Sequence, residues 1–120
     1  MKIVNLTQHN STHDQQEQGL FDLSEATALK TLLTFNSLPT KAEIRERAES
    51  IAQLAQDTNA PFAMIGGAGY LMASLESALI AKGITPLHAF SQRVSVEKHN
   101  EDGTVSKENI FKHVGFIGLD

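Results

Sequence analysis

Residues 62–72 read Phe-Ala-Met-Ile-Gly-Gly-Ala-Gly-Tyr-Leu-Met, and this stretch decides the fold. Its apolar start predicts a buried strand over 62–65. Glycines follow at once, and Leu71, Leu75, Ala78 and Leu79 then repeat at helical spacing until Gly83 stops the helix. The stretch therefore predicts a strand, a tight glycine turn and a helix in direct succession.

The residues before this stretch predict two more strands and three helices. Apolar runs predict strands over 3–6 and 19–23. A short helix over 14–18 has Ser11 or Thr12 as its N-cap, a second follows an N-cap at Ser24, and a third follows Thr40, which has capping-box spacing to Glu43. We interpret the charged residues of the third helix as a solvated face with an i,i+4 pair: Glu43, Arg45, Glu46, Arg47 and Glu49.

The residues after it predict a fourth strand over 84–90, an exit through 91–93, and an antiparallel hairpin with its turn at Asp102-Gly103. Strands separated by helices imply right-handed parallel crossovers with helices on both faces of one sheet. The predicted fold is a single Rossmann-like α/β domain over 1–120, with a mostly parallel sheet in a core over 1–93 and a C-terminal antiparallel β-hairpin over 94–120.

Composition limits the function classes. The chain has 120 residues, no Cys and a net charge of −4, and neither half has a basic excess. Long DNA or RNA is therefore not an expected partner, and a disulfide framework or thiolate metal site is excluded. No apolar run approaches the length of a membrane span, and no export signal opens the sequence. We expect a cytoplasmic protein that does not enter membranes.

Three polar segments follow predicted parallel strands, and all should emerge at the carboxyl edge of the sheet, which we call the rim. The first, residues 7–12, holds His9, either a general acid or base or simply a solvated side chain, together with the neutral groups of Thr7, Gln8, Asn10 and Ser11. The last, residues 91–93, holds Arg93, either a phosphate contact or half of an ion pair, beside Ser91 and Gln92.

The middle segment is the glycine turn, Gly66-Gly67-Ala68-Gly69, followed by Tyr70. Such a turn brings backbone N–H groups and a helix N-terminus up to an anion, or it only packs a strand tightly against a helix. Neither a dinucleotide fingerprint nor a Walker loop is present, because Met72 replaces the third glycine and no Gly-Lys-Ser/Thr follows. Tyr70 either stacks on a base or covers the edge of the core.

The remaining histidines carry no predicted chemistry. His9 and His13 have His-x3-His spacing but no third ligand nearby in sequence, so no metal site and no cofactor are expected. We interpret His88 as a packed or edge residue of a strand, and His99 and His113 as surface residues. No Ser-His-Asp order or catalytic carboxylate pair stands out, so acyl transfer and glycoside hydrolysis lack support.

Three stretches carry a resemblance to a known family: Leu6-Thr7-Gln8-His9 with Thr12 and Gln15, residues 65–72, and residues 83–93, Gly-Ile-Thr-Pro-Leu-His-Ala-Phe-Ser-Gln-Arg. Over residues 1–93 the chain resembles small single-domain CRISPR-associated Rossmann-like proteins, the ring nucleases and CARF-type domains of antiviral defence. The hairpin from Ser95 onward has no counterpart in that pattern.

The resemblance implies a homodimer that binds cyclic oligoadenylate across a two-fold axis and linearises it without metal, by attack of a ribose 2′-hydroxyl on the adjacent phosphate. It implies that residues 7–11 and 66–70 cradle phosphate and adenine. His9 would protonate the leaving 5′-oxygen, and Arg93 or Ser91 would steady the non-bridging oxygens. The hairpin would serve instead as a dimerisation arm.

Two other functions stay open. One is a non-catalytic module that senses a nucleotide or only mediates assembly through the hairpin. The other is a nucleotide-processing enzyme of flavodoxin-like fold, which we consider weakened because the sequence shows no carboxylate at the rim.

Overall fold

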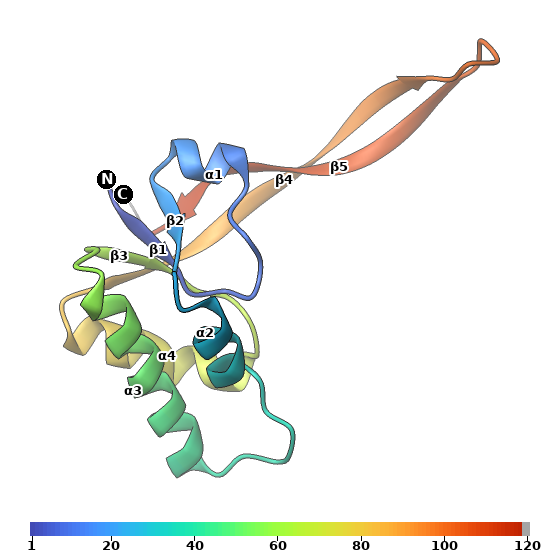
Figure 1. Cartoon of the computed structure of the whole chain (residues 1–120). Helices are drawn as coiled ribbons and strands as arrows, with labels where there is room; N and C mark the ends of the chain where they lie inside the picture. The colour runs from blue at the N-terminus through green and yellow to red at the C-terminus, as the bar shows by residue number, and fades with distance from the viewer. Residues whose placement is uncertain (119–120) are drawn as a thin grey trace.

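The structure, a computed structural model, describes residues 1–118. Its strands form one sheet in the order β2-β1-β3-β4-β5 (Figure 1). They are β1 (Ile3–Asn5), β2 (Leu20–Asp22), β3 (Phe62–Met64), β4 (Thr85–His99) and β5 (Val105–Ile117). The first four strands are parallel to one another and β5 is antiparallel to β4, so the predicted mostly parallel sheet with a C-terminal hairpin is confirmed.

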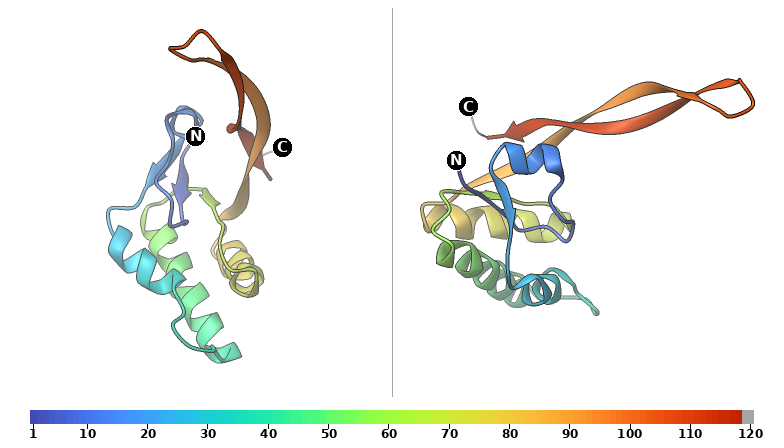
Figure 2. Two further views of the ribbon diagram at one scale, coloured as in Figure 1. Left: turned by 90° about the vertical axis from the view of Figure 1, so that its right-hand side faces the viewer. Right: turned by 45° about the horizontal axis from the view of Figure 1, so that its top comes forward.

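Helices cover both faces of the sheet, as predicted. The four helices are α1 (His13–Glu17), α2 (Ala26–Leu33), α3 (Lys41–Asp57) and α4 (Gly69–Ala81). The short α1 lies on one side of the sheet, and α2, α3 and α4 lie on the other (Figures 1 and 2). In the sheet, β2 lies on one side of β1, and β3 and then β4 lie on the other. The order in which strands are added therefore reverses direction after β2.

The core is divided between the two faces. The larger cluster joins alternate strand residues, such as Val4 and Ala63, to the apolar stripes of α2, α3 and α4, including Leu29, Ile51 and Leu75. The smaller cluster on the other face consists of strand residues alone: Ile3, Leu20, Met64, Leu87 and Phe116, with Phe62 against them. Helix α1 contributes no buried residue. The α2–α4 face therefore supplies most of the apolar burial that stabilises the domain.

Two of the three predicted N-caps are confirmed. Thr12 forms a reciprocal capping box with Gln15 at the start of α1, and the Thr40 hydroxyl accepts a hydrogen bond from the Glu43 N–H at the start of α3. The prediction for Ser24 is wrong: α2 begins one residue later, with Glu25 as its N-cap and no side-chain hydrogen bond to the cap. The chain leaves β2 at Leu23, which is buried in the core, and the turn that follows sets the start of α2.

Arg47 is not part of a solvated face. Its guanidinium donates to the backbone carbonyls of Thr31, Leu32 and Thr34 at 2.9, 3.1 and 2.7 Å, at the C-terminal end of α2, where helix carbonyls lack their usual N–H partners; of the three, the Thr31 carbonyl also accepts from the Thr34 N–H. It also lies 4.6 Å from the centre of the Phe35 ring and makes the predicted pair with Glu43 at 3.4 Å. One arginine therefore fastens the C-terminal end of α2 to α3.

The fourth strand does not end at Phe90 as predicted. It continues to His99 and pairs with β5 along its whole outer length, with one irregularity between Phe90 and Ser91. Residues 91–93 therefore belong to a β-ribbon and not to a loop, and the expected boundary at residue 93 falls inside a continuous strand. These residues contain no glycine, proline or asparagine that would favour a turn.

Beyond the sheet, this ribbon projects away from the domain (Figures 1 and 2). We call residues 88–117 the arm and the rest of the described chain the body. The arm lengthens the molecule to 58 × 35 × 25 Å, with a radius of gyration of 17.1 Å. A compact chain of this length would have roughly 14 Å. No helix within residues 1–118 is long and apolar enough to cross a membrane.

The base of the arm is attached to α1. Gln18 donates from its amide to the carbonyl of Val114 at 3.2 Å, and its amide oxygen lies 2.9 Å from the ring Nε2 of His113. The His113 ring packs on Phe116 and is partly buried, so His113 is less exposed than the surface residue expected from the sequence. Desolvation lowers the pKa of His113, with Asp14 opposing the shift.

Candidate functional site at the rim

In α/β folds with a parallel sheet, ligands bind at the carboxyl ends of the strands, at the place where the strand order reverses. In this sheet that place lies between β1 and β3. The loop after β1 leads to α1 on one face, and the loop after the adjacent β3 leads to α4 on the other. These loops diverge and leave a crevice between them at the carboxyl ends of β1 and β3. The prediction that the first rim loop and the glycine turn become neighbours is confirmed: the two line one hollow together.

Asn5 organises the first rim loop. Its side chain lies at the end of β1, is 3% exposed and is the only buried polar residue in the described chain. The amide nitrogen donates to the carbonyl of His9 at 2.7 Å, and the amide oxygen accepts from the N–H and the hydroxyl of Thr7 at 2.9 and 2.7 Å. Because both polar atoms of the amide are satisfied within the loop, the backbone of residues 7–9 is held in one conformation.

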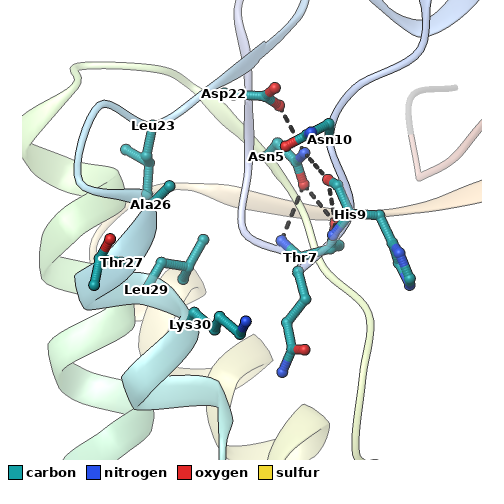
Figure 3. Close-up of a pocket in the computed structure, with 11 residues that line it drawn as sticks. Asn5, Thr7, His9, Asn10, Asp22, Leu23, Ala26, Thr27, Leu29 and Lys30 are labelled. Atoms are coloured by element: carbon teal, nitrogen blue, oxygen red, sulfur yellow. Dashed lines mark hydrogen bonds between the residues drawn. The ribbon is translucent and has the colours of Figure 1, made fainter.

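Asp22, at the end of β2, supplies a carboxylate to the same network (Figure 3). Asn5 donates to Asp22 Oδ1 at 2.8 Å, and the N–H of Ser11 donates to its two oxygens at 3.1 and 3.3 Å. The expectation that the rim lacks a carboxylate is therefore wrong. Asp22 follows Leu20 and Phe21 directly in a strand of three residues, so its place at the strand end became evident only with the strand boundary.

The glycine turn offers backbone donors. Gly67 has φ = +140°, a conformation that L side chains rarely adopt, whereas Gly66 and Gly69 have no such constraint. Within residues 1–118, the N–H groups of residues 66–70 donate to no backbone or side-chain acceptor. They lie at the N-terminus of α4, where aligned peptide dipoles favour an anion.

Three hollows adjoin along the rim, and Thr7 and His9 line all of them. The glycine hollow, about 310 Å³, lies between the first rim loop and Gly66, Gly67 and Ala68. The α1 hollow, about 400 Å³, is bounded by residues from α1, β3 and β4, among them Gln15, Gly66 and His88. The α2 hollow, about 320 Å³, is bounded by Gln8, Asn10, Asp22 and α2. Volumes of this size suit parts of a small-molecule ligand.

Besides Asp22, two exposed ionisable residues line this region, His9 and Lys30. The imidazole of His9 points away from the contact between Asn5 and Asp22 (Figure 3) and has no hydrogen-bond partner within residues 1–118. Lys30 extends from α2 toward Thr7, and no carboxylate of the described chain pairs with its ammonium. Lys30 was missed in the sequence because nothing in the pattern of α2 shows which of its exposed positions faces the rim.

His88 is a second residue that sequence reasoning missed. It lines the α1 hollow from the position in β4 directly after the parallel pairing with β3, and its Nε2 lies 3.1 Å from Glu76 Oε1 of α4. The interpretation as a packed or edge residue did not include a place at the rim. Its neighbours in sequence, Leu87 and Ala89, indicated a strand but not where the parallel part of that strand ends.

The other predicted site residues lie outside these three hollows. The N–H of Ser11 is occupied by Asp22. Gly69 and Tyr70 begin α4, and the Tyr70 ring packs edge-on against Phe35 with centroids 5.4 Å apart, in agreement with the alternative that Tyr70 covers the edge of the core.

The placement of Ser91, Gln92 and Arg93 at the rim is wrong. They lie in the arm, paired with His113, Lys112 and Phe111 of β5, and line none of the three hollows. The error follows from the length of β4, because a strand that continues past the rim carries these residues away from it. The searched residues, 1–118, contain no group of three or more His, Asp or Glu side chains able to hold a metal ion, and His13 pairs with Glu17 at 3.0 Å.

Comparison with known proteins gives one match. A family model described as "Uncharacterized protein MJ1673 family" matches residues 1–117. The chain belongs to the MJ1673 family. The match includes both strands of the arm as well as the body. No curated protein and no solved structure matches it significantly.

Proposed function

We propose that this protein binds a small phosphate-bearing ligand, a nucleotide, in the hollows between the first rim loop and the glycine turn. The observation that carries the proposal is the meeting of Thr7 and His9 with Gly66 at the crevice between β1 and β3. Backbone N–H groups of residues 66–70 without acceptors supply the donors for a phosphate, and Lys30 supplies a nearby cation.

A short nucleotide fits the charge of this region better than a long nucleic acid. The whole chain carries −4, and the rim offers Lys30 and the imidazoles of His9 and His88 against the carboxylates of Asp22 and Glu76. Neutralising many phosphates in a row needs a basic surface. A ligand with few phosphates needs only oriented N–H groups and one cation.

The specific ligand that we propose is cyclic oligoadenylate, and the reaction its linearisation; this part rests on the resemblance of residues 1–93 to ring nucleases. A ribose 2′-hydroxyl would lose its proton to solvent and attack the adjacent phosphorus, the bond from phosphorus to the 5′-oxygen would break, and the products would be a 2′,3′-cyclic phosphate and a 5′-hydroxyl. His9 would donate the proton to the leaving 5′-oxygen. The glycine turn and Lys30 replace Ser91 and Arg93 as the groups expected to steady the phosphate oxygens.

The experiment compares two glycines of the same strand-to-helix connection. Gly66 lines two hollows and Gly69 lines none of the three, and neither has the positive φ that would strain a side chain. We expect Gly66→Leu to weaken binding by at least about tenfold, equivalent to ~1.4 kcal/mol. Gly69→Leu should bind as the unaltered chain does. Affinities are measured by calorimetry with cyclic tri-, tetra- and hexa-adenylate and with AMP, in EDTA.

Chromatography of the same mixtures distinguishes catalysis from sensing. A linear product that His9→Ala fails to form would support the ring-nuclease reaction. Binding without product would favour a non-catalytic nucleotide sensor, an alternative supported by the Asn5–Asp22 network, which already fixes the loop without a ligand. Absence of binding to every compound, or equal binding by both leucine variants, would overturn the proposed site.

A further inference from the structure

The arm exposes a large apolar surface that the body does not cover. Most of it lies on β5, where Phe111 is 76% exposed and Ile110 is 43% exposed. The exposed apolar residues of the arm are Phe90, Val96, Val105, Ile110, Phe111, Val114 and Ile117. A two-stranded ribbon in water is marginally stable without further packing. An apolar patch of this kind on a projecting ribbon indicates an interaction surface.

The charges of the arm indicate what kind of partner it contacts. Residues 88–117 carry four basic and four acidic side chains, so the arm is neutral and the net charge of −4 belongs to the rest of the chain. A neutral surface with alternating signs has no attraction for a polyanion such as nucleic acid. It suits a surface of the same alternating kind, such as that of a second copy of this chain.

We propose that β5 pairs antiparallel with β5 of a second copy, about a two-fold axis that passes beside Ile110. In an isologous pairing of one strand with itself, residues equally far from the axis face each other. With the axis at Ile110, Glu108 of each copy, which lies 3.5 Å from Lys98 of its own chain, would lie opposite Lys112 of the other. Two Glu108–Lys112 ion pairs result, one on each side of the axis. Unlike charges directly opposite each other stabilise a pair of strands.

The same register also matches apolar residues. Side chains alternate along a strand, so Glu108, Ile110 and Lys112 share one face, on which Val94 is the neighbour of Ile110 in β4. Ile110 would meet Ile110 of the second copy at the axis, extending this apolar strip across both copies. On the opposite face, the two Phe111 rings would be diagonal neighbours, a spacing that aromatic rings can bridge.

The free edge of β4 is the competing surface. Arg93 and Glu97 would also face each other in a self-pairing of β4 about Ser95. However, β4 pairs with β3 at Thr85–Leu87 and borders the α1 hollow at His88, so the body lies beside that edge. The outer edge of β5 has no strand beside it in the described sheet, and the body contacts this strand at its base, where Gln18 donates to the Val114 carbonyl, four residues from Ile110. Most of the exposed apolar residues of the arm also lie on β5, which favours this strand.

The pairing has a consequence for the rim. Ile117 pairs with His88 at the rim, and Ile110 lies seven positions further out, or roughly 24 Å along a strand. Two rims joined through Ile110 would then be roughly 48 Å apart. One small ligand cannot bridge that distance, so each chain of such a dimer would hold its own ligand. This inference stands without the proposed function and does not depend on any ligand.

The test uses charge reversal in two separate chains. Light scattering coupled to size-exclusion chromatography should show a dimer of the unaltered chain. Lys112→Glu places Glu opposite Glu108, and Glu108→Lys places Lys opposite Lys112, so each variant alone should be a monomer at concentrations where the unaltered chain is dimeric. An equimolar mixture of the two should recover the dimer mass, because both cross-strand pairs are again of unlike charge.

Arg93→Glu is the matched control, because it reverses a charge on the same arm but on β4. It should leave the dimer intact, and circular dichroism should show all variants folded. A monomeric unaltered chain at every concentration, a mixture of variants that stays monomeric, or a dimer lost only in Arg93→Glu would each overturn the pairing through β5.

Discussion

The body and the arm use the same kinds of side chains in opposite ways. In the body, apolar residues such as Leu71 and Leu75 are fully buried between the sheet and three helices, and Asn5 has every polar atom satisfied. In the arm, Phe111 and Val105 stand mostly in solvent on a ribbon with no helix over it. The body is therefore stabilised within one chain, whereas the arm is built for a contact that one chain does not supply.

The largest expected effect comes from truncating one apolar side chain in each region. Leu75→Ala removes a fully buried side chain from the large cluster and should lower the free energy of unfolding by about 3 kcal/mol. Phe111→Ala removes a larger side chain but should change the stability of the monomeric chain by less than about 0.5 kcal/mol. Urea unfolding of dilute protein measures both free energies. If Phe111→Ala lowers the free energy of unfolding as much as Leu75→Ala does, the arm is packed within one chain and the contrast with the body is wrong.

The sequence predicted the body well because its signals are local. Periodic leucines in α4, capping residues at Thr12 and Thr40, and a strand followed by glycines each specify an element within a few residues. Once the order of strands and helices was known, right-handed crossovers limited the topology, and the meeting of residues 7–12 with the glycine turn followed.

The arm and parts of the site depend on where strands end, which the sequence signals weakly. Residues 91–93 lack a turn signal, but the preceding apolar run ends at Phe90, so the strand was predicted to stop there. That error placed Arg93 at the rim and left His88 interpreted only as a packed or edge residue of a strand. Asn5, in contrast, carried a usable signal: a polar residue between Val4 and Leu6 in a buried strand needs hydrogen-bond partners.

A smaller effect should come from the link between α2 and α3. Arg47→Ala removes three hydrogen bonds to carbonyls at the end of α2 and should cost about 2 kcal/mol. Arg45→Ala, an exposed arginine on the same helix, should cost less than about 0.5 kcal/mol. Thermal or urea unfolding measures the pair, and equal losses would mean that the contacts of Arg47 contribute nothing beyond an exposed charge.

The smallest effect concerns the junction where body and arm meet. The Nδ1 of His113 is buried without a hydrogen-bond partner while its Nε2 contacts Gln18, so the fold favours the neutral ring. Desolvation lowers the pKa of His113 below its ordinary value near 6.5, so between the two values the unfolded chain binds more protons than the folded one.

The stability contributed by this group is therefore complete above pH 6.5 and is lost as the pH falls through the ordinary value toward the lowered one. His113→Gln should flatten the fall in melting temperature between pH 7.5 and pH 5, relative to the unaltered chain. His99→Gln, at the exposed tip of the arm, should leave the slope unchanged. An identical slope in all three chains would mean that protonation of His113 is equally easy in the folded state, and that its contact with Gln18 does not hold the arm to α1.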